Sequence, residues 1–567
     1  MLGLFVKKSW NTKAKKRYEQ FQLVESYYDP QTRNSRHRVI MNLSKLPRHV
    51  IDAIAQSLKQ GQAVVGTTLA SVKVSQGDAL RGAGLLAIYR AWHRHQLPQL
   101  LREFTPAEQQ SVLAMVTGRI LSPCSKLALK TQLADTLLAR ACSRPRLDED
   151  ELYRVLDKLR THFYTLQPGL RAQLAGEPVL GLYDLTSTYF EGSCAEGGQY
   201  GHSRDKRWDR YQIVIGLVCD EQGLPVALEV WPGHTADRST VGERARALKA
   251  QFGIKRAVLV GDAGLYSQAN IETLEELGLD YILRVEWHRE RRQWEAQASR
   301  QLGLFDRRGV AEWVEAGVRY VGCLAEERQQ RAAQRRQAGM KKAQVQLQRL
   351  ARTAAAGGYY SAATLHARVK AVLAKCGVSE LWQIHIADLE GNTISPAAKA
   401  RLTLSFAVDE AAVQRRADRA GIYVLQTSLT AAQCAAPEVD ANYRRLQYAE
   451  RAFRHIKSYL QLRPVYHYKH RRIRAHVLVC FLAFYLVKQL ELELRAQGVG
   501  TEVELLLRRW EQLKVSAIQL ELGDEQRTEW QWSLGEVGQG IQRELQRLGW
   551  WKSVDSYRHS LTKLLTQ

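Results

Sequence analysis

The run EPVLGLYDLTSTYF, from Glu177 to Phe190, marks the point where short strands replace a helical pattern. Two more β-rich runs follow after turns, RYQIVIGLVCD (210–220) and LPVALEVW (224–231). A helix (STVGERARALKAQF), a buried strand (IKRAVLVGDAG), a second helix (SQANIETLEELG) and another strand (DYILRVE) come next. Three consecutive strands followed by alternating helices and strands predict an α/β fold.

The same order of elements occurs in ribonuclease-H-like sheets, although counting elements does not establish a fold. The helix that would close such a sheet does not follow directly. Residues 287–420 instead hold a long polar helix, AEERQQRAAQRRQAGMKKAQVQLQRLARTAAA, and two β-like runs, and strand character returns only at GIYVLQTSL (421–429). The mixed charges of that helix are typical of a solvated helix or a short coiled coil. We therefore expect a core interrupted by a mixed α/β insertion.

Composition and charge exclude several classes of protein. Of the 567 residues, 45% are hydrophobic and 25% are charged, as in ordinary folded proteins and unlike disordered or fibrous chains. The 82 Lys and Arg residues against 58 Asp and Glu give a net charge of +24, which favours a polyanionic partner, above all nucleic acid. Eight scattered cysteines without a CxxC pair predict neither a zinc cluster nor a disulfide framework.

The apolar segments predict a cytoplasmic protein. The longest apolar run, Val477–Val487, has about half the ~20 residues that a membrane span needs, so we expect a buried helix there. The N-terminal MLGLFVKKSW places its short apolar stretch before its lysines, the reverse of a secretory signal. The cysteine pattern also fits a reducing compartment.

Two aspartates stand at unusual places in the predicted sheet. Asp184 lies within an otherwise apolar strand, where a carboxylate is costly to bury without a partner. Asp262 lies where the strand AVLVG ends, at the rim of the sheet, which is where open sheets commonly bind ligands. Either aspartate alone could be an ordinary turn or capping residue. Together they suggest a site.

A third carboxylate, Glu450, lies in a strongly basic segment. Between residues 441 and 480 there are ten Lys and Arg, four His and Glu450 as the only acid. On one predicted helix, Tyr443, Glu450 and Lys457 share a face by i, i+7 spacing, with Arg454 adjacent. An incidental glutamate on a basic face is the alternative. The pattern favours a metal ligand beside an anion-binding site.

Three carboxylates can hold two divalent cations that promote in-line attack of a water or a 3′-hydroxyl on phosphorus. Ligation by oxygen alone suits Mg²⁺ or Mn²⁺. The basic surroundings would hold the phosphodiester backbone, so charge and carboxylates predict one class of substrate, DNA or RNA.

The motifs around these residues resemble those of the DDE transposases of bacterial insertion sequences, in the branch with a Tyr-x2-Arg-x3-Glu-x6-Lys signature. The resemblance runs through LYDLTSTYFEG, GHSRDKRWDRYQIVIGL, LPVALEVWPGHTADRST, VLVGDAG, GIYVLQTSL and YAERAFRHIKSYLQLRPVYHYKHRRIRAHV, and includes SPCSKLAL and LYRVLDKL. It implies that Asp184, Asp262 and Glu450 are the metal-binding catalytic triad, with two Mg²⁺ or Mn²⁺ ions, of a ribonuclease-H-like core. The signature arginine is replaced by Leu446, and Arg444 or Arg445 would have to supply that cation.

The resemblance also implies a division of the chain. We expect a basic β-hairpin (1–48), a helical DNA-binding region (49–170), the first part of the core (171–286), the insertion (287–420), the closing strand and catalytic helix (421–500) and a C-terminal helical region (501–567). The predicted DNA contacts are Tyr443, Arg444, Arg445, Arg454 and Lys457, together with Trp287 and Trp294, which could equally be core residues.

The implied activity is cut-and-paste transposition by a chain that acts on double-stranded DNA, both transposon ends and target, as a homodimer on the bacterial nucleoid. Two alternatives use the same residues differently. A ribonuclease-H-like nuclease would cut without joining ends, and a domesticated relative would only bind DNA.

Overall fold

The computed structural model describes residues 3–13, 16–29, 34–60, 72–81, 83–132, 148–172, 179–192, 195–235, 240–242, 245–246, 257–285, 297, 309–358, 361–388, 401–500, 502–511, 514–522, 527–534 and 539–547. The chain divides into two compact units. The first comprises Met1–Leu174, Ser187–Ile213 and Ala452–Gln567, and the second comprises Ala175–Thr186 and Val214–Arg451.

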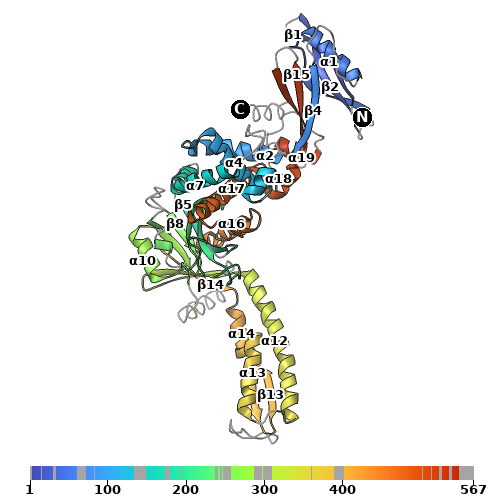
Figure 1. Ribbon diagram of the computed structural model, residues 1–567. Coiled ribbons are helices and arrows are strands. Elements are labelled where there is room, and N and C mark those ends of the chain that lie inside the picture. Colours follow the sequence, from blue (N-terminus) through green and yellow to red (C-terminus); the bar gives the residue numbers. More distant parts are fainter. Residues whose placement is uncertain are drawn as a thin grey trace. The chain divides into compact units, whose positions relative to one another are not determined.

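A sheet of eight strands organises the second unit, in the order β10-β11-β14-β9-β8-β5-β6-β7 (Figure 1). β8 pairs in parallel with both β5 and β9, whereas β14 runs antiparallel to β9 and β11, and β10 antiparallel to β11. The strands are β5 (Val179–Tyr189), β6 (Gln212–Cys219), β7 (Pro225–Pro232), β8 (Ala257–Gly261), β9 (Asp280–Arg284), β10 (Val310–Glu315), β11 (Val318–Leu324) and β14 (Ile422–Thr427). The α/β fold class is therefore confirmed, with a mixed sheet.

Apolar strands place the middle of this sheet inside the unit. All eight residues of β6 are buried, which is the pattern of a strand covered on both faces. Gly216 leaves room for the indole of Trp231, since a Cβ there would lie 2.5 Å from the ring. Helix α10 (Gln268–Glu276) connects β8 to β9, and the Ser267 side chain caps its first turn. The predicted helix at 239–252 lies largely outside the described residues.

The predicted insertion contains a helical part with its own core. Helices α12 (Glu326–Ala355) and α13 (Ala362–Cys376) pack together beside a two-stranded sheet of β12 (Trp382–Ala387) and β13 (Thr403–Val408) (Figure 1). A short 3₁₀ turn, η1 (Ser379–Leu381), precedes β12, and helix α14 (Glu410–Asp418) follows β13. The long polar helix predicted from sequence is present, and its buried face packs on α13.

One part of the predicted insertion belongs to the main sheet. β10 and β11 fall within 287–420, yet they extend the sheet beyond β14. Arg319 explains part of this attachment, because its buried guanidinium donates to the carbonyls of Leu429 and Cys434, just after β14. These contacts span more than a hundred residues of sequence, so local patterns do not show them.

Helix α17 (His470–Ala496) is the centre of the first unit. Its residues Val477–Val487 are all buried, as the sequence predicts. The helices that pack on α17 are α2 (Ala83–Arg94), α4 (Pro106–Leu121), α7 (Glu149–Thr161), α8 (Phe163–Ala172) and α18 (Val503–Glu511). Helices α3 (Leu97–Leu100), α5 (Lys126–Gln132) and α19 (Gln539–Arg547) also belong to this unit. Within the described residues, no helix combines the length and the apolar character that crossing a membrane requires.

Two three-stranded sheets in the first unit correct the sequence predictions. The hairpin predicted within residues 1–48 is present as β2 (Lys16–Asp29) and β3 (Asn34–Asn42), but β1 (Gly3–Lys13) pairs with β2 and makes the sheet three-stranded. Helix α1 (Arg48–Gln60) packs on this sheet. β4 (Val72–Arg81) interrupts the region 49–170, which we expected to be helical. It pairs with β15 (Lys514–Leu522), which also pairs with β16 (Arg527–Leu534), so the region 501–567 is not purely helical either. Pairing between segments over 400 residues apart leaves no local periodicity to recognise.

Candidate active site

Asp184 and Asp262 occupy matching positions on two neighbouring parallel strands. In the β5–β8 pair, Leu182 lies opposite Val260. Two residues further along the same register, Asp184 comes opposite Asp262, which directly follows the last residue of β8, Gly261. Carboxyl ends of parallel strands form one edge of a sheet, so the register brings the two aspartates next to each other there. We call Asp184 and Asp262 the sheet-edge aspartates.

Backbone amides orient both side chains. The Leu185 amide donates to Oδ1 of Asp184 at 2.8 Å, and the Gly264 amide donates to Oδ1 of Asp262 at 3.0 Å. Both aspartates are half-buried, whereas Tyr183 and Leu185, on either side of Asp184, are almost fully buried. Bonds to an ionised acceptor are stronger than neutral ones and restrict its rotation. The sheet edge therefore holds two oriented carboxylates that remain partly accessible.

Tyr443 lies near one of these aspartates. It belongs to helix α15 (Ala436–Arg444), which packs on β8, β9, β10 and β11. Burial raises the pKa of Tyr443, while Arg284 and Arg328 lower it and the nearby Asp262 raises it. The Tyr443 ring also contacts that of Tyr423, with centroids 5.4 Å apart. The structure thus brings this predicted site residue into the electrostatic surroundings of Asp262.

Glu450 lies on a different helix from Tyr443. Helix α16 (Gln447–Ser458) begins only after a break, where amides bond three residues back, as Leu446 to Tyr443 and Tyr448 to Arg445. The continuous helix predicted to carry Tyr443, Glu450 and Lys457 is therefore interrupted at residues 445–446, and the three side chains differ in burial, since Tyr443 and Lys457 are buried and Glu450 is exposed. Glu450 itself is exposed near the start of α16.

Carboxylate oxygens suit a hard divalent cation, but Glu450, the predicted third ligand, does not join Asp184 and Asp262 in one group. Aspartate and glutamate oxygens are the ligands that Mg²⁺ and Mn²⁺ prefer. Among the described residues, however, no three His, Cys, Asp or Glu side chains come together closely enough to hold a metal ion. The structure therefore pairs Asp184 with Asp262 and does not add Glu450 to a three-ligand group.

Arg444 and Arg445, the candidates for the missing signature cation, are both engaged locally. The Arg444 guanidinium bonds to Asp440 at 2.9 Å and to the Leu324 carbonyl at 3.0 Å. Arg445 bonds to Glu221 at 3.2 Å. Leu446, at the signature position itself, is buried. Both arginines are therefore bonded within the protein, and neither is an obvious replacement for the signature arginine.

Lys457 forms a buried ion pair that sequence analysis did not anticipate. Its Nζ lies 3.0 Å from Oδ1 of Asp205, with both side chains less than one tenth exposed, and Arg463 bonds to the same oxygen. Burial lowers the pKa of Lys457, although Asp205 raises it. Arg454, by contrast, is exposed. Asp205 lies in the motif GHSRDKRWDR, but nothing local indicates a partner 252 residues away.

Trp287 and Trp294, the predicted stacking residues, lie outside the described residues.

Comparisons with known proteins place the chain in context. Residues 175–486, just over half of it, match a family model described as "Transposase DDE domain". The sequence matches no curated protein. Among solved structures, a piggyBac transposase synaptic complex with hairpin DNA is similar over 77% of this chain and 82% of that chain, with 10% sequence identity and a TM-score of 0.35.

Proposed function

This chain belongs to the transposase DDE-domain family, and we propose that it is a cut-and-paste DNA transposase whose metal-binding carboxylates are Asp184, Asp262 and Glu450. The observation that carries the proposal is the register of β5 and β8, which puts two carboxylates side by side at the edge of the sheet. Family membership supports the reaction class, and the register supports the choice of Asp184 and Asp262.

Asp184 and Asp262 would hold the divalent cations, and Glu450 would complete the ligand set from the first turn of α16. Because no three-carboxylate group exists in the described residues, Glu450 has to come closer to the sheet edge when ions and DNA bind. The ions would supply a nucleophile at neutral pH and stabilise charge on the leaving oxygen.

Two successive in-line displacements at phosphorus account for cutting and joining. In the first, a water oxygen bonds to phosphorus at the transposon end, the bond to the 3′-oxygen breaks, and that oxygen takes up a proton as a free 3′-hydroxyl. In the second, this hydroxyl loses its proton, bonds to a phosphorus of target DNA and releases a 3′-oxygen there. In both steps the sheet-edge aspartates would hold the divalent cations beside the reacting phosphate.

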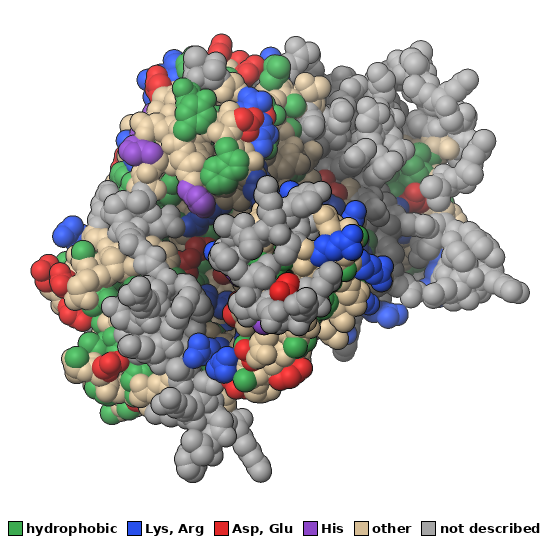
Figure 2. All heavy atoms as spheres, turned by 90° about the horizontal axis from the view of Figure 1, so that it is seen from below, with side chains coloured by type: hydrophobic (Ala, Val, Ile, Leu, Met, Phe, Trp, Pro, Cys, Tyr) green, Lys and Arg blue, Asp and Glu red, His purple; other side chains and the backbone are tan. Residues whose placement is uncertain are grey.

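The remaining parts of the proposal concern partners. The net charge of +24 favours DNA, and Figure 2 shows Lys and Arg side chains in several separate groups on the face that it presents. We propose that residues 49–170 recognise the terminal inverted repeats. We also propose that a homodimer holds the two paired ends, on the nucleoid in the bacterial cytoplasm. Among the residues of α16 predicted to contact DNA, Arg454 has the exposure that a phosphate contact needs.

The decisive experiment gives the full chain Mg²⁺ and DNA that carries the terminal repeats of its own element. We expect free 3′-hydroxyl ends and products joined to target DNA. Asp184→Asn, Asp262→Asn and Glu450→Gln should each lower both by about 1,000-fold or more while end binding persists, because the carboxylates hold ions and the basic surface holds DNA.

Asp409→Asn is the matched control. Asp409 caps helix α14 through its side chain, and asparagine caps a helix as well as aspartate does, so this variant should cleave normally. Cleavage at near wild-type rate in any of the three site variants would remove that residue from the site. Cleavage without joined products would make the protein a nuclease, and binding without metal-dependent cleavage would make it a DNA-binding relative.

A further inference from the structure

Arginine side chains line a cavity of about 1290 Å³ in the second unit, and the sheet-edge aspartates are not part of its lining. Four of them come from the first turns of α12: Arg328, Arg331, Arg335 and Arg336. The first three are spaced i, i+3 and i+7, so they share one helix face. They extend for about 10 Å along the helix axis, since each residue adds about 1.5 Å.

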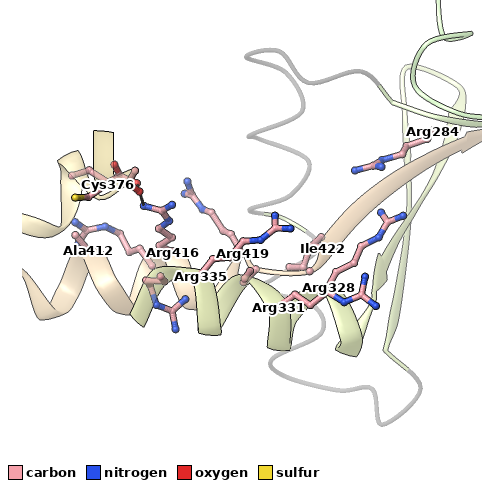
Figure 3. Close-up of a pocket in the computed structure, with 16 residues that line it drawn as sticks. Arg284, Arg328, Arg331, Arg335, Cys376, Ala412, Arg416, Arg419 and Ile422 are labelled. Atoms are coloured by element: carbon pink, nitrogen blue, oxygen red, sulfur yellow. Dashed lines mark hydrogen bonds and ion pairs between the residues drawn. The ribbon is translucent and has the colours of Figure 1, made fainter. Parts of the chain in front are cut away.

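Other elements supply four more arginines to the same cavity. Arg415 and Arg416 lie in α14, Arg419 caps the end of that helix, and Arg284 is the last residue of β9. Figure 3 shows Arg284, Arg328 and Arg419, from three different elements, projecting into the same space. We call this the arginine-lined cavity.

Few of these positive charges are neutralised by the protein. Glu380 is the only acidic residue of the lining, and Nη1 of Arg416 donates a hydrogen bond to its Oε1 at 2.9 Å. Arg331 has a weak contact with Glu327 at 3.4 Å. Arg335, Arg336, Arg415 and Arg419 make no ion pair within the described part of the chain. Nε of Arg284 is buried and has no hydrogen-bond partner there.

Guanidinium groups cannot lose their charge at physiological pH, and they pair with phosphate oxygens through two parallel hydrogen bonds. Such a concentration of charge repels itself unless an anion neutralises it. The row of arginines on α12 and the second row on α14 suit a ligand with several phosphates in sequence. A single phosphate would leave most of them without a counter-charge.

The rest of the lining indicates which part of a nucleic acid would be bound. Besides the arginines and Glu380 it consists of Ala, Cys, Gly and Ile, with no aromatic ring on which bases could stack, so the charged guanidinium groups are what it offers a nucleic acid, and phosphate oxygens are their best acceptors. We propose that the arginine-lined cavity binds the phosphodiester backbone of double-stranded DNA, independently of base sequence. This site rests on the proposed function and adds to it a contact surface carried by the insertion.

Direct DNA binding tests this site without any cleavage. The probe is a short duplex of random sequence with chelator present, titrated against the full chain by fluorescence anisotropy over a range of salt concentrations. Arg335→Gln/Arg419→Gln removes one arginine from each helix. We expect about tenfold weaker binding at physiological salt, and a slope of log K against log salt that is less steep by about 1.8, the loss of two phosphate contacts.

Arg349→Gln/Arg352→Gln is the matched control, because both arginines are exposed on the same helix α12 outside the cavity. Its affinity and salt slope should equal those of the wild type, and both double variants should melt at the wild-type temperature. Equal slopes for wild type and Arg335→Gln/Arg419→Gln would overturn the proposal, as would the same loss in the control.

Two further measurements distinguish duplex DNA from other phosphate ligands, and the proposal for the cavity can be tested separately from the catalytic one. If inorganic tripolyphosphate displaces the duplex completely at low concentration, or if single strands lose as much affinity as duplex, the cavity serves another phosphate ligand and the proposal fails. The sheet-edge aspartates are tested by cleavage alone. If Arg335→Gln/Arg419→Gln binds the duplex as the wild type does while Asp184→Asn fails to cleave, only the proposal for the cavity is refuted. If Asp184→Asn still cleaves DNA, only the catalytic assignment is refuted.

Discussion

The cations around Asp205 and those of the arginine-lined cavity look alike in the sequence and differ in the structure. Around Asp205, Lys457 and Arg463 converge on one buried carboxylate. In the cavity, the lining holds eight arginines and a single acid, Glu380, and outside the lining Glu327 makes one weak contact with Arg331. The difference teaches that positive charge has two uses in this protein. We expect the cations with a buried partner to belong to the fold, and we propose that the cations without one bind DNA.

A third arrangement completes the comparison. Lys126 is buried, no carboxylate among the described residues acts on it, and its Nζ lies 3.4 Å from Nδ1 of His476. Burial first, and then the charge of Arg119, lower the pKa of Lys126 to about 7. A lysine can give up its proton when it lacks a partner, whereas an arginine cannot. The arginines of the cavity therefore keep their charge and are available to an external anion.

The largest effect is expected from removing the carboxylate at the centre of the first cluster. Asp205→Asn leaves the buried Lys457 without a counter-charge, which typically costs about 3–5 kcal/mol of unfolding free energy. Denaturant unfolding of the full chain measures it. Asp148→Asn, which keeps the N-cap of α7, should unfold like the wild type. A similar unfolding free energy for Asp205→Asn and Asp148→Asn would contradict the claim that Lys457 depends on Asp205 as its counter-charge.

Lys126→Met should show a pH-dependent gain in stability. In the unfolded chain Lys126 holds its proton to about pH 10.4, and in the folded chain only to about 7, so its burial is unfavourable and the cost is fully present below pH 7. The advantage of the variant over wild type should shrink by about 1.4 kcal/mol per pH unit between pH 8 and 10. Unfolding curves at several pH values measure it.

The neighbours of Lys126 set the conditions of that test. Arg119, His467 and His476 face it together with the thiols of Cys124 and Cys480. The pKa of His467 is lowered to about 3, mainly by burial, and that of His476 is also lowered, so both stay neutral across this range. A constant difference between Lys126→Met and wild type from pH 7 to 10 would show that Lys126 keeps its charge.

Lys457 and Arg454 should differ in their contribution to DNA binding. Arg454→Gln removes an exposed cation of α16 and should make the salt slope less steep by about 0.9, one phosphate contact. Lys457→Met removes a cation already paired with Asp205, so the slope of the remaining folded protein should be unchanged. Anisotropy titrations below the melting temperature of both variants compare them. A less steep salt dependence of DNA binding in Lys457→Met would indicate that Lys457 contacts DNA.

The smallest expected effect concerns the acid of the cavity. Glu380→Gln frees Arg416 from its ion pair and should tighten binding to random duplex by about two- to threefold at low salt, because one more cation becomes available. The same substitution at an exposed acid outside the cavity, Glu326→Gln, should change binding less. Weaker binding by Glu380→Gln would mean that Glu380 orients Arg416 and does not compete with the ligand.

The parts of the fold that sequence predicts are those with strong local patterns. The strands at 177–190, 210–220 and 224–231, the helix at 267–278 and the buried helix around Val477–Val487 all have a periodicity that a few residues reveal. The sheet of β4, β15 and β16 escapes prediction because its strands are joined by long-range pairing. The break between α15 and α16 escapes it because the residues there are ordinary helix formers.

The candidate site divides in the same way. Asp184 and Asp262 can be recognised as polar interruptions of apolar strands, but only the β5–β8 register makes them neighbours. The spacing of Arg328, Arg331 and Arg335 is visible in the sequence, yet it reads as one face of a solvated helix. Its meaning depends on Arg415 and Arg419, more than 80 residues later, and only folding brings those rows together.

The sharing of one cation site by Asp184 and Asp262 is the central claim, and a double-mutant cycle on Mn²⁺ binding tests it most directly. Calorimetry on the wild type, Asp184→Asn, Asp262→Asn and the double variant gives four affinities without DNA or catalysis. If the two aspartates hold the same ion, each single substitution removes most of the affinity and the double variant loses little more. Independent, additive losses would contradict the account, as would Mn²⁺ binding that neither substitution changes.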